Sequence, residues 1–212
     1  MMESGPPDAF GSVYRLLSGA VVPRPIAWVS SRSPDGRDNL APYSFFNVVA
    51  VDPPVLMFSP VGRAATGGLK DTARNILGDA GTGEHGDGDA DGTAEFVIQL
   101  VDSDLAEAMN ASSATLAHGE SEFEHAGVTP VEAEAVDAAY VAEAPVAFEC
   151  TLYEAHGVGG STMVLGEVVR AHVDEELLTD GAFDVRQFDA LGRLAGEFYC
   201  DTEGRFTMER PP

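Results

Sequence analysis

Histidine side chains can bind metals or act as acids and bases, but the spacing of the histidines in this sequence predicts neither role. None of the five stands in an HxxxH or HExxH pattern, which a metal site on one helix face requires. The sequence also contains no GxSxG nucleophile elbow and no Walker phosphate loop. We therefore predict no metal site. The sequence also lacks the catalytic residues expected of a hydrolase or a kinase.

Two further motif matches fall in the segment 78–93, which is rich in glycine and acidic residues. Residues 81–86 fit GxGxxG, but no strand precedes them and no helix follows, so they do not predict a dinucleotide fingerprint. Asp87, Asp89 and Asp91 match the first half of a calcium loop, whose twelfth position is Ile98 here instead of glutamate. We expect a solvated loop inserted into the domain, with calcium binding as the alternative.

Charge narrows the possible partners. Thirty-five acidic residues against twelve basic ones give the 212-residue chain a net charge of −23, which disfavours nucleic acid and anionic membranes as partners. Lys70 is the only lysine, so eleven of the twelve basic residues are arginine. Adaptation to high salt explains this composition, because ions screen the mutual repulsion of surface carboxylates. The sequence thus favours a halophilic protein.

The length suits one domain with a well-buried core, and we assign residues 1–212 to it. No run of about 18 apolar residues predicts a membrane span, and the first residues lack the basic and apolar regions of a signal peptide. Cys150 and Cys200 have no CxxC spacing, so we predict free buried thiols, with a disulfide or a nucleophile as the alternative. We expect a cytoplasmic location.

The elements that must position a site are mainly strands. Ile26–Ser31 is typical of a buried strand, 33–37 of a turn with proline and glycine, and Asn39–Ala41 of the returning strand of a hairpin. Further strands are expected at 45–51, 55–58 and 95–101, and a long antiparallel pair at 145–153 and 162–173. Short helices are expected at 72–77, capped by Asp71, and in a segment capped by Ser103 or Asp104 that runs through Asn110. The segment 111–143 is expected to be irregular. These elements predict a mainly β protein, an antiparallel and Greek-key-like barrel with a few peripheral short helices.

Several segments resemble, in the same order, those of the flavin reductase-like family. They are PRPIAWVSS at 23–31, NLAPYSFFN at 39–47, DPP at 52–54, KDTARNI at 70–76 and GRLAG at 192–196. The similarity covers nearly the whole chain except 78–93. It implies the FMN-binding split β-barrel of flavoredoxin-like proteins and a homodimer with FMN near the subunit interface.

The resemblance also implies an activity. An NAD(P)H-dependent flavin reductase passes hydride directly from the nicotinamide to flavin N5, so no catalytic side chain is required. The cofactors would be FMN and either NADH or NADPH, with a protein electron acceptor as a further partner. A flavoredoxin-like electron carrier and a non-redox flavin-binding protein are the alternatives.

The site implied by the resemblance is the hairpin with its Ala41–Asn47 corner around the flavin ring. Lys70 and Thr72 would contact the phosphate or ribityl chain, with Arg63 as a rival cation. The full set of expected flavin contacts is Ser30, Ser31, Asn39, Ala41, Pro42, Tyr43, Ser44, Phe45, Asn47, Ser59, Lys70, Thr72 and Arg193.

Structural roles compete with several of these assignments. Ser30 and Ser31 point to opposite faces of a strand, so at most one of them faces a given site. At least one of Phe45 and Phe46 is expected in the core. Lys70 is either a ligand contact or a surface lysine, and Arg193 either reaches across a dimer or has a structural use.

The charge composition generates the first prediction. We expect the protein to lose structure below molar salt, because unscreened carboxylates repel one another. Thermal melting in low and high KCl measures this, and an unchanged melting temperature would contradict halophilic adaptation.

Overall fold

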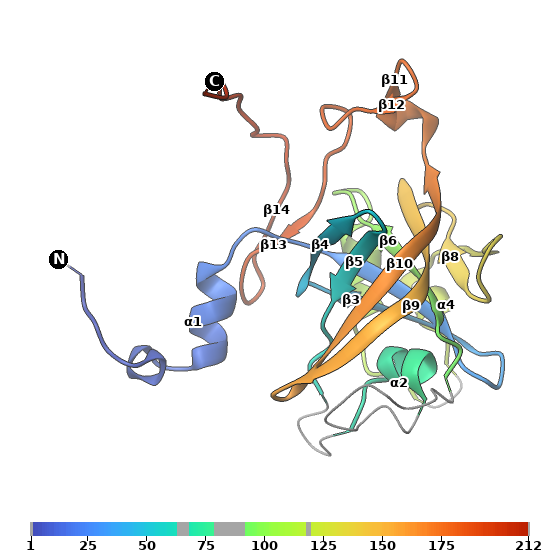
Figure 1. The fold of residues 1–212 in the computed structure, drawn as a ribbon, viewed down its shortest axis with the longest axis horizontal. Helices are drawn as coiled ribbons and strands as arrows, with labels where there is room; N and C mark the ends of the chain where they lie inside the picture. The colour runs from blue at the N-terminus through green and yellow to red at the C-terminus, as the bar shows by residue number, and fades with distance from the viewer. Residues whose placement is uncertain (1, 63–67, 79–91, 118–119, 212) are drawn as a thin grey trace.

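The computed structural model describes residues 2–62, 68–78, 92–117 and 120–211 (Figure 1). Its main element is a seven-stranded antiparallel sheet with the strand order β3-β2-β6-β9-β10-β5-β4. These strands are β2 (Ala27–Arg32), β3 (Asp38–Tyr43), β4 (Phe46–Val51), β5 (Pro54–Phe58), β6 (Glu95–Leu100), β9 (Val146–Val158) and β10 (Ser161–Val173). The mainly β, antiparallel class that the sequence predicts is confirmed.

Short elements surround the barrel. The helices are α1 (Val13–Ala20), α2 (Asp71–Leu77), α3 (Ala106–Ala111) and α4 (Glu122–Ala126), with 3-10 turns η1 (Pro7–Phe10) and η2 (Glu175–Leu177). Three small sheets join β1 (Arg24–Pro25), β13 (Gly192–Arg193) and β14 (Tyr199–Cys200); β7 (Pro130–Glu132) and β8 (Ala139–Val141); and β11 (Leu178–Thr179) and β12 (Ala182–Phe183). No helix in the described part of the chain is long and apolar enough to cross a membrane.

The β2–β3 hairpin closes through a turn that requires glycine. Gly36 has a φ of +78° and donates its N–H to the Ser33 carbonyl at 2.8 Å, a left-handed conformation that residues with a Cβ rarely adopt. Ser31 lies opposite Asn39, and the register continues as far as Tyr43. Because successive side chains alternate across a strand, Asn39 and Tyr43 share one face of β3.

The longest pairing is the β9–β10 ribbon, which confirms the predicted antiparallel pair. Strand β10 also pairs with β5, and β9 with β6, so the ribbon joins the two sides of the barrel. Gly166 of β10 lies against the fully buried ring of Phe96, and a Cβ at this position would clash with that ring. The close approach explains why a glycine stands in the middle of a long strand.

Two hydrophobic clusters cover opposite faces of β2. The barrel cluster includes Ala27, Val29, Tyr43, Phe46, Phe58, Ile76, Phe96, Ile98, Cys150 and Val164. The outer cluster includes Ile26, Trp28, Leu40, Met109, Phe123, Val128 and Val141, most of which belong to β2, β3, β8, α3 and α4. Trp28 is fully buried in it and donates its indole N–H to Ser112 Oγ at 2.8 Å, which satisfies its only polar atom.

The expectation that 111–143 is irregular is wrong. This segment contains α4, β7 and β8, and it contributes buried residues such as Phe123 and Val141. These elements span only three to five residues, too few for a periodic pattern to be recognisable in sequence. Burial against the outer face of the hairpin stabilises them.

Smaller expectations also need correction. The cap predicted for Asp71 is wrong, because α2 begins at Asp71 itself and this carboxylate pairs with Arg74 at 2.9 Å. Both cysteines are free as predicted, but only Cys150 is fully buried, since Cys200 is partly exposed. Most of the predicted loop 78–93, including both motif matches apart from Gly92, lies outside the described residues.

Glu149 anchors the segment between β7 and β8 to the sheet. Its fully buried carboxylate accepts hydrogen bonds from the Glu134 N–H at 3.0 Å, the Ala135 N–H at 2.5 Å and His172 Nε2 at 2.5 Å. Burial by itself would raise the pKa of Glu149. The hydrogen bonds from Glu134, His172 and Ala135 outweigh burial, so this pKa lies below its usual value of 4.5.

The Glu149 contacts generate a stability prediction. Glu149→Gln should lower the free energy of unfolding by about 3 kcal/mol, because two amides and His172 lose a charged acceptor. Glu154→Gln, which breaks the exposed 3.2 Å pair with His156 in the same strand, should change it by less than about 0.5 kcal/mol. Urea unfolding measures both, and equal effects would contradict the anchoring role.

The same contacts predict a pH dependence. A carboxyl with a lowered folded-state pKa stabilises the protein fully above its unfolded pKa. The difference in stability between the wild type and Glu149→Gln should therefore be largest above pH 4.5 and shrink as the pH falls through the folded-state pKa.

Candidate functional site

Helix α2 lies across the β2–β3 hairpin, and a small hydrogen-bond network joins them. Thr72 Oγ1 accepts from Asn39 Nδ2 at 2.7 Å and from the Tyr43 hydroxyl at 2.9 Å. One turn further along the helix, Asn75 Nδ2 donates to Ser31 Oγ at 3.1 Å. Thr72 is 1% exposed and Ser31 is fully buried, so these bonds form away from water, where they are strong. They hold α2 against the strand face that carries Asn39 and Tyr43.

Lys70 immediately precedes α2. Its ammonium lies 5.7 Å from the centroid of the Tyr43 ring, within the range of a cation–π interaction. Its side chain is exposed, and it makes no salt bridge to any residue in the described ranges. In a chain with a net charge of −23, this ammonium is therefore not neutralised by a carboxylate of the described chain.

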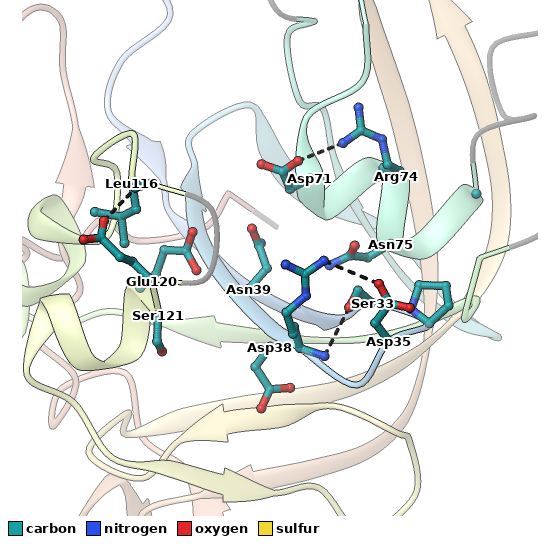
Figure 2. A pocket seen from close by; sticks show the side chains of 15 residues that line it. Ser33, Asp35, Asp38, Asn39, Asp71, Arg74, Asn75, Leu116, Glu120 and Ser121 are labelled. Carbon is teal, nitrogen blue, oxygen red and sulfur yellow. Dashed lines mark hydrogen bonds and ion pairs between the residues drawn. The ribbon is translucent and has the colours of Figure 1, made fainter.

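A cavity of about 610 Å³ adjoins the hairpin turn, α2 and the segment before α4 (Figure 2). Asn39 projects into the space between α2 and the segment that carries Leu116 and Glu120. The lining residues are Ser33, Pro34, Asp35, Arg37, Asp38, Asn39, Asp71, Arg74, Asn75, Gly78, Leu116, Ala117, Glu120, Ser121 and Glu122.

The charge of this cavity disfavours an anionic ligand. Five of its lining residues are acidic and two are arginines, and Arg74 is paired with Asp71 at 2.9 Å. Burial raises the pKa of Glu122, and the charge of Asp71 adds to the effect. Lys70 does not line this cavity.

The corner after β3 forms a second group of residues. Phe45 is half-buried, and its ring lies 6.5 Å from Tyr14 of α1 and 5.9 Å from the guanidinium of Arg24. Ser44 Oγ accepts from Arg24 Nε at 3.4 Å, and the Phe45 carbonyl accepts from the Ser59 N–H at 2.8 Å. The corner is therefore connected to α1, β1 and the end of β5.

The structure divides the expected site residues into these two groups and a remainder. Asn39, Tyr43, Lys70, Thr72 and Ser31 gather at α2; Ser44, Phe45 and Ser59 gather at the corner; and Ala41 and Pro42 lie along β3 between them. Phe46 enters the barrel cluster, in agreement with the expected core role for one of the two phenylalanines. The rival cation Arg63 lies outside the described residues.

Three expected residues lie apart from both groups. Ser30 is fully buried beneath β8, where its hydroxyl donates to the Ala139 carbonyl at 2.5 Å. Asn47 is exposed and accepts from the N–H of Val48 at 2.8 Å. Arg193 lies in β13, with its guanidinium 4.5 Å from the Tyr199 ring.

Sequence reasoning missed Arg24. This arginine is 8% exposed and donates to the carbonyls of Ser18, Val21 and Leu194 as well as to Ser44. The available signal was an arginine between two prolines in an otherwise apolar run, which predicts a charged side chain inside the fold.

Solved structures define the class of the fold as the split barrel of flavin reductases. Nitrilotriacetate monooxygenase component B from Bacillus cereus is 34% identical, with 98% of this chain and 99% of that chain covered and a TM-score of 0.84. The 2-nitrobenzoate 2-nitroreductase of Pseudomonas fluorescens is 32% identical, with 94% of this chain and 90% of that chain covered and a TM-score of 0.79. Flavoredoxin of Desulfovibrio vulgaris is 26% identical, with 89% of this chain and 91% of that chain covered and a TM-score of 0.70.

The sequence comparisons give the family. The model of the flavin reductase like domain matches residues 18–192. An uncharacterised protein of Halalkalibacterium halodurans is 39% identical over 204 residues, which cover 93% of this chain and 90% of the relative. The chain therefore belongs to the flavin reductase-like family and is an oxidoreductase of that type.

The α2 network generates a prediction about Thr72. Thr72→Val should lower the free energy of unfolding by about 2 kcal/mol, because Asn39 and Tyr43 lose a buried acceptor. Thr72→Ser keeps the oxygen and should lose less than about 1 kcal/mol. Urea unfolding compares the two, and an equal loss would show that the hydroxyl does not hold the helix.

Proposed function

We propose that this protein is an NAD(P)H-dependent flavin reductase that binds FMN. The family match supports a flavin ligand. The ammonium of Lys70 supports a flavin with a phosphate group, because it can anchor that phosphate. When bound, FMN supplies an acceptor for the hydride of the nicotinamide. The chain's task is then to bind both nucleotides, orient them and exclude water.

The residues present fit a flavin by the chemistry of their groups. Lys70 offers an ammonium not neutralised by the described carboxylates, which suits a phosphate. Asn39 brings a side-chain amide to the same edge of the barrel, where the Lys70 ammonium lies beside the Tyr43 ring. Ala41 and Pro42 add apolar surface between this edge and Ser44. Such a site offers one cationic anchor for the phosphate, polar partners and an apolar wall.

The expected contacts differ in the roles we propose for them. We assign the lining of the flavin to Asn39, Ala41, Pro42, Ser44, Phe45, Ser59 and Lys70. Four residues are buried and hydrogen-bonded within the protein, so we assign them to holding β2, β3 and α2 in place: Ser30, Ser31, Tyr43 and Thr72. Asn47 and Arg193 would complete the site only from the other subunit of a dimer.

We also propose a homodimer, with nicotinamide nucleotide and flavin bound at each site. Large apolar side chains are exposed along α1, β4 and the C-terminal tail, which supports an apolar interface. They include Tyr14 at 64%, Leu17 at 55%, Val51 at 85%, Phe198 at 71% and Phe206 at 82% exposure. Figure 1 shows α1 and the tail standing away from the barrel, as segments that wrap a partner would.

Three broader proposals accompany this function. Residues 1–212 form one domain with an insertion at 78–93. The protein is cytoplasmic, which its two free thiols support, because such thiols persist in reducing compartments. Its source is halophilic, which the net charge of −23 supports.

Flavoredoxin of Desulfovibrio vulgaris supports a second candidate, an FMN carrier that exchanges electrons with a protein acceptor. A non-redox flavin-binding protein on the same barrel is the third. Anaerobic mixing of the FMN-loaded protein with NADH or NADPH at high salt separates them. Bleaching of the flavin absorbance by either nucleotide supports the reductase, whereas a carrier or a non-redox protein stays yellow. A reduced protein donor then separates these two, because it bleaches only the carrier. A purified protein that binds no flavin overturns all three.

Lys70 provides the prediction for this site. Lys70→Ala should weaken FMN binding roughly tenfold or more, because a charge-assisted contact to the phosphate is lost. Lys70→Arg should retain most of the affinity, since a phosphate accepts either cation. Titration with FMN and with riboflavin, which lacks the phosphate, measures both effects. An unchanged FMN affinity, or an equal loss for riboflavin, would remove Lys70 from the phosphate side.

A further inference from the structure

Arg24 is a buried cation that has no carboxylate partner. It is 8% exposed, and no described acidic residue forms a salt bridge with it. Burying a charge is costly unless it is paired, so a chain with 35 acidic residues would be expected to supply a partner. The guanidinium instead donates to backbone carbonyls, which carry only partial negative charge. Its positive charge is therefore only partly compensated.

The acceptors of Arg24 come from segments that are distant in sequence. Nη1 donates to the carbonyls of Ser18 and Val21 at the end of α1, the latter at 2.7 Å, and Nη2 donates to the Leu194 carbonyl at 2.6 Å. The end of a helix is the negative end of its dipole, which favours a cation there. One side chain thus joins the N-terminal helix, β1 and the segment after β13.

The remaining contacts of Arg24 lead to the corner. Nε donates to Ser44 Oγ at 3.4 Å, and the guanidinium lies 5.9 Å from the centroid of the Phe45 ring. Both residues belong to the proposed flavin site. Because Arg24 holds α1 and Leu194 with its other nitrogens, the position of Ser44 and Phe45 depends on both ends of the chain.

We infer that Arg24 is a positioning residue of the flavin site, which fixes the Ser44–Phe45 corner and keeps a positive charge beside it that favours the reduced flavin. The inference rests on the proposed function. Reduced FMN carries more negative charge than oxidised FMN, and a nearby charge is one of the ways in which a protein tunes a flavin. A carboxylate paired with Arg24 would cancel this effect. The inference therefore explains why no described carboxylate pairs with Arg24.

The test compares the dissociation constants of oxidised FMN and of FMN reduced anaerobically with dithionite. In Arg24→Gln, the preference for reduced over oxidised FMN should fall about tenfold, which corresponds to about 30 mV in a two-electron midpoint potential. Arg24→Lys keeps the charge and loses the fork of donors, so both constants should rise while their ratio stays within about threefold. Arg205→Gln is the matched control, because Arg205 also donates to backbone carbonyls but far along the tail, and its ratio should not change.

Each outcome decides the question. If Arg24→Gln shifts both constants equally, Arg24 has only a structural role and the inference is overturned. If Arg24→Gln does not fold, Arg24→Lys decides the question. A tenfold fall in the preference for reduced over oxidised FMN, despite the retained charge, overturns the inference. An unchanged preference supports it. If the wild-type protein binds neither form of FMN, the proposed function fails and the inference fails with it.

Discussion

Strand β2 is covered on both faces, and the rest of the structure depends on this constraint. Ala27 and Val29 enter the barrel cluster, whereas Trp28 enters the outer cluster with α3 and α4. A shift of the strand by one residue would exchange these faces, so its register is strongly determined. The hairpin partner β3 inherits this register, and it carries Asn39 and Tyr43 to the position where α2 binds.

Charge has different uses in different parts of the molecule. Arg32 pairs with Asp38, Glu132 and Asp137, a network that ties the hairpin to the β7–β8 pair. Lys70 and Arg24 lack such partners among the described residues and stand at the two groups of site residues. A cation without a carboxylate partner keeps its charge available to a bound anion, and these two cations also stand beside the expected site residues. This contrast connects the composition of the protein to its proposed chemistry.

The sequence predicted the elements that local patterns encode. The hairpin and the β9–β10 ribbon have alternating or apolar strands around recognisable turns, and both are present. It did not predict α1, α4 or the β7–β8 pair, because these short elements gain their stability from distant partners. For the site, the motifs marked β3, its corner and the start of α2 as neighbours. They did not reveal that Thr72 bonds to β3 or that Ser30 lies under β8, since these contacts join residues 33 and 109 positions apart.

The sequence by itself determined the mainly β class, the family resemblance and the presence of one lysine in an acidic chain. These properties follow from residue types and local order, which require no knowledge of long-range contacts. Only the tertiary structure decided that the expected contacts form two groups, that Ser31 and Thr72 are buried, and that Arg24 reaches the corner. A guanidinium that joins Ser18, Ser44 and Leu194 has no local pattern, because these partners are distant in sequence and only the tertiary structure brings them to one side chain.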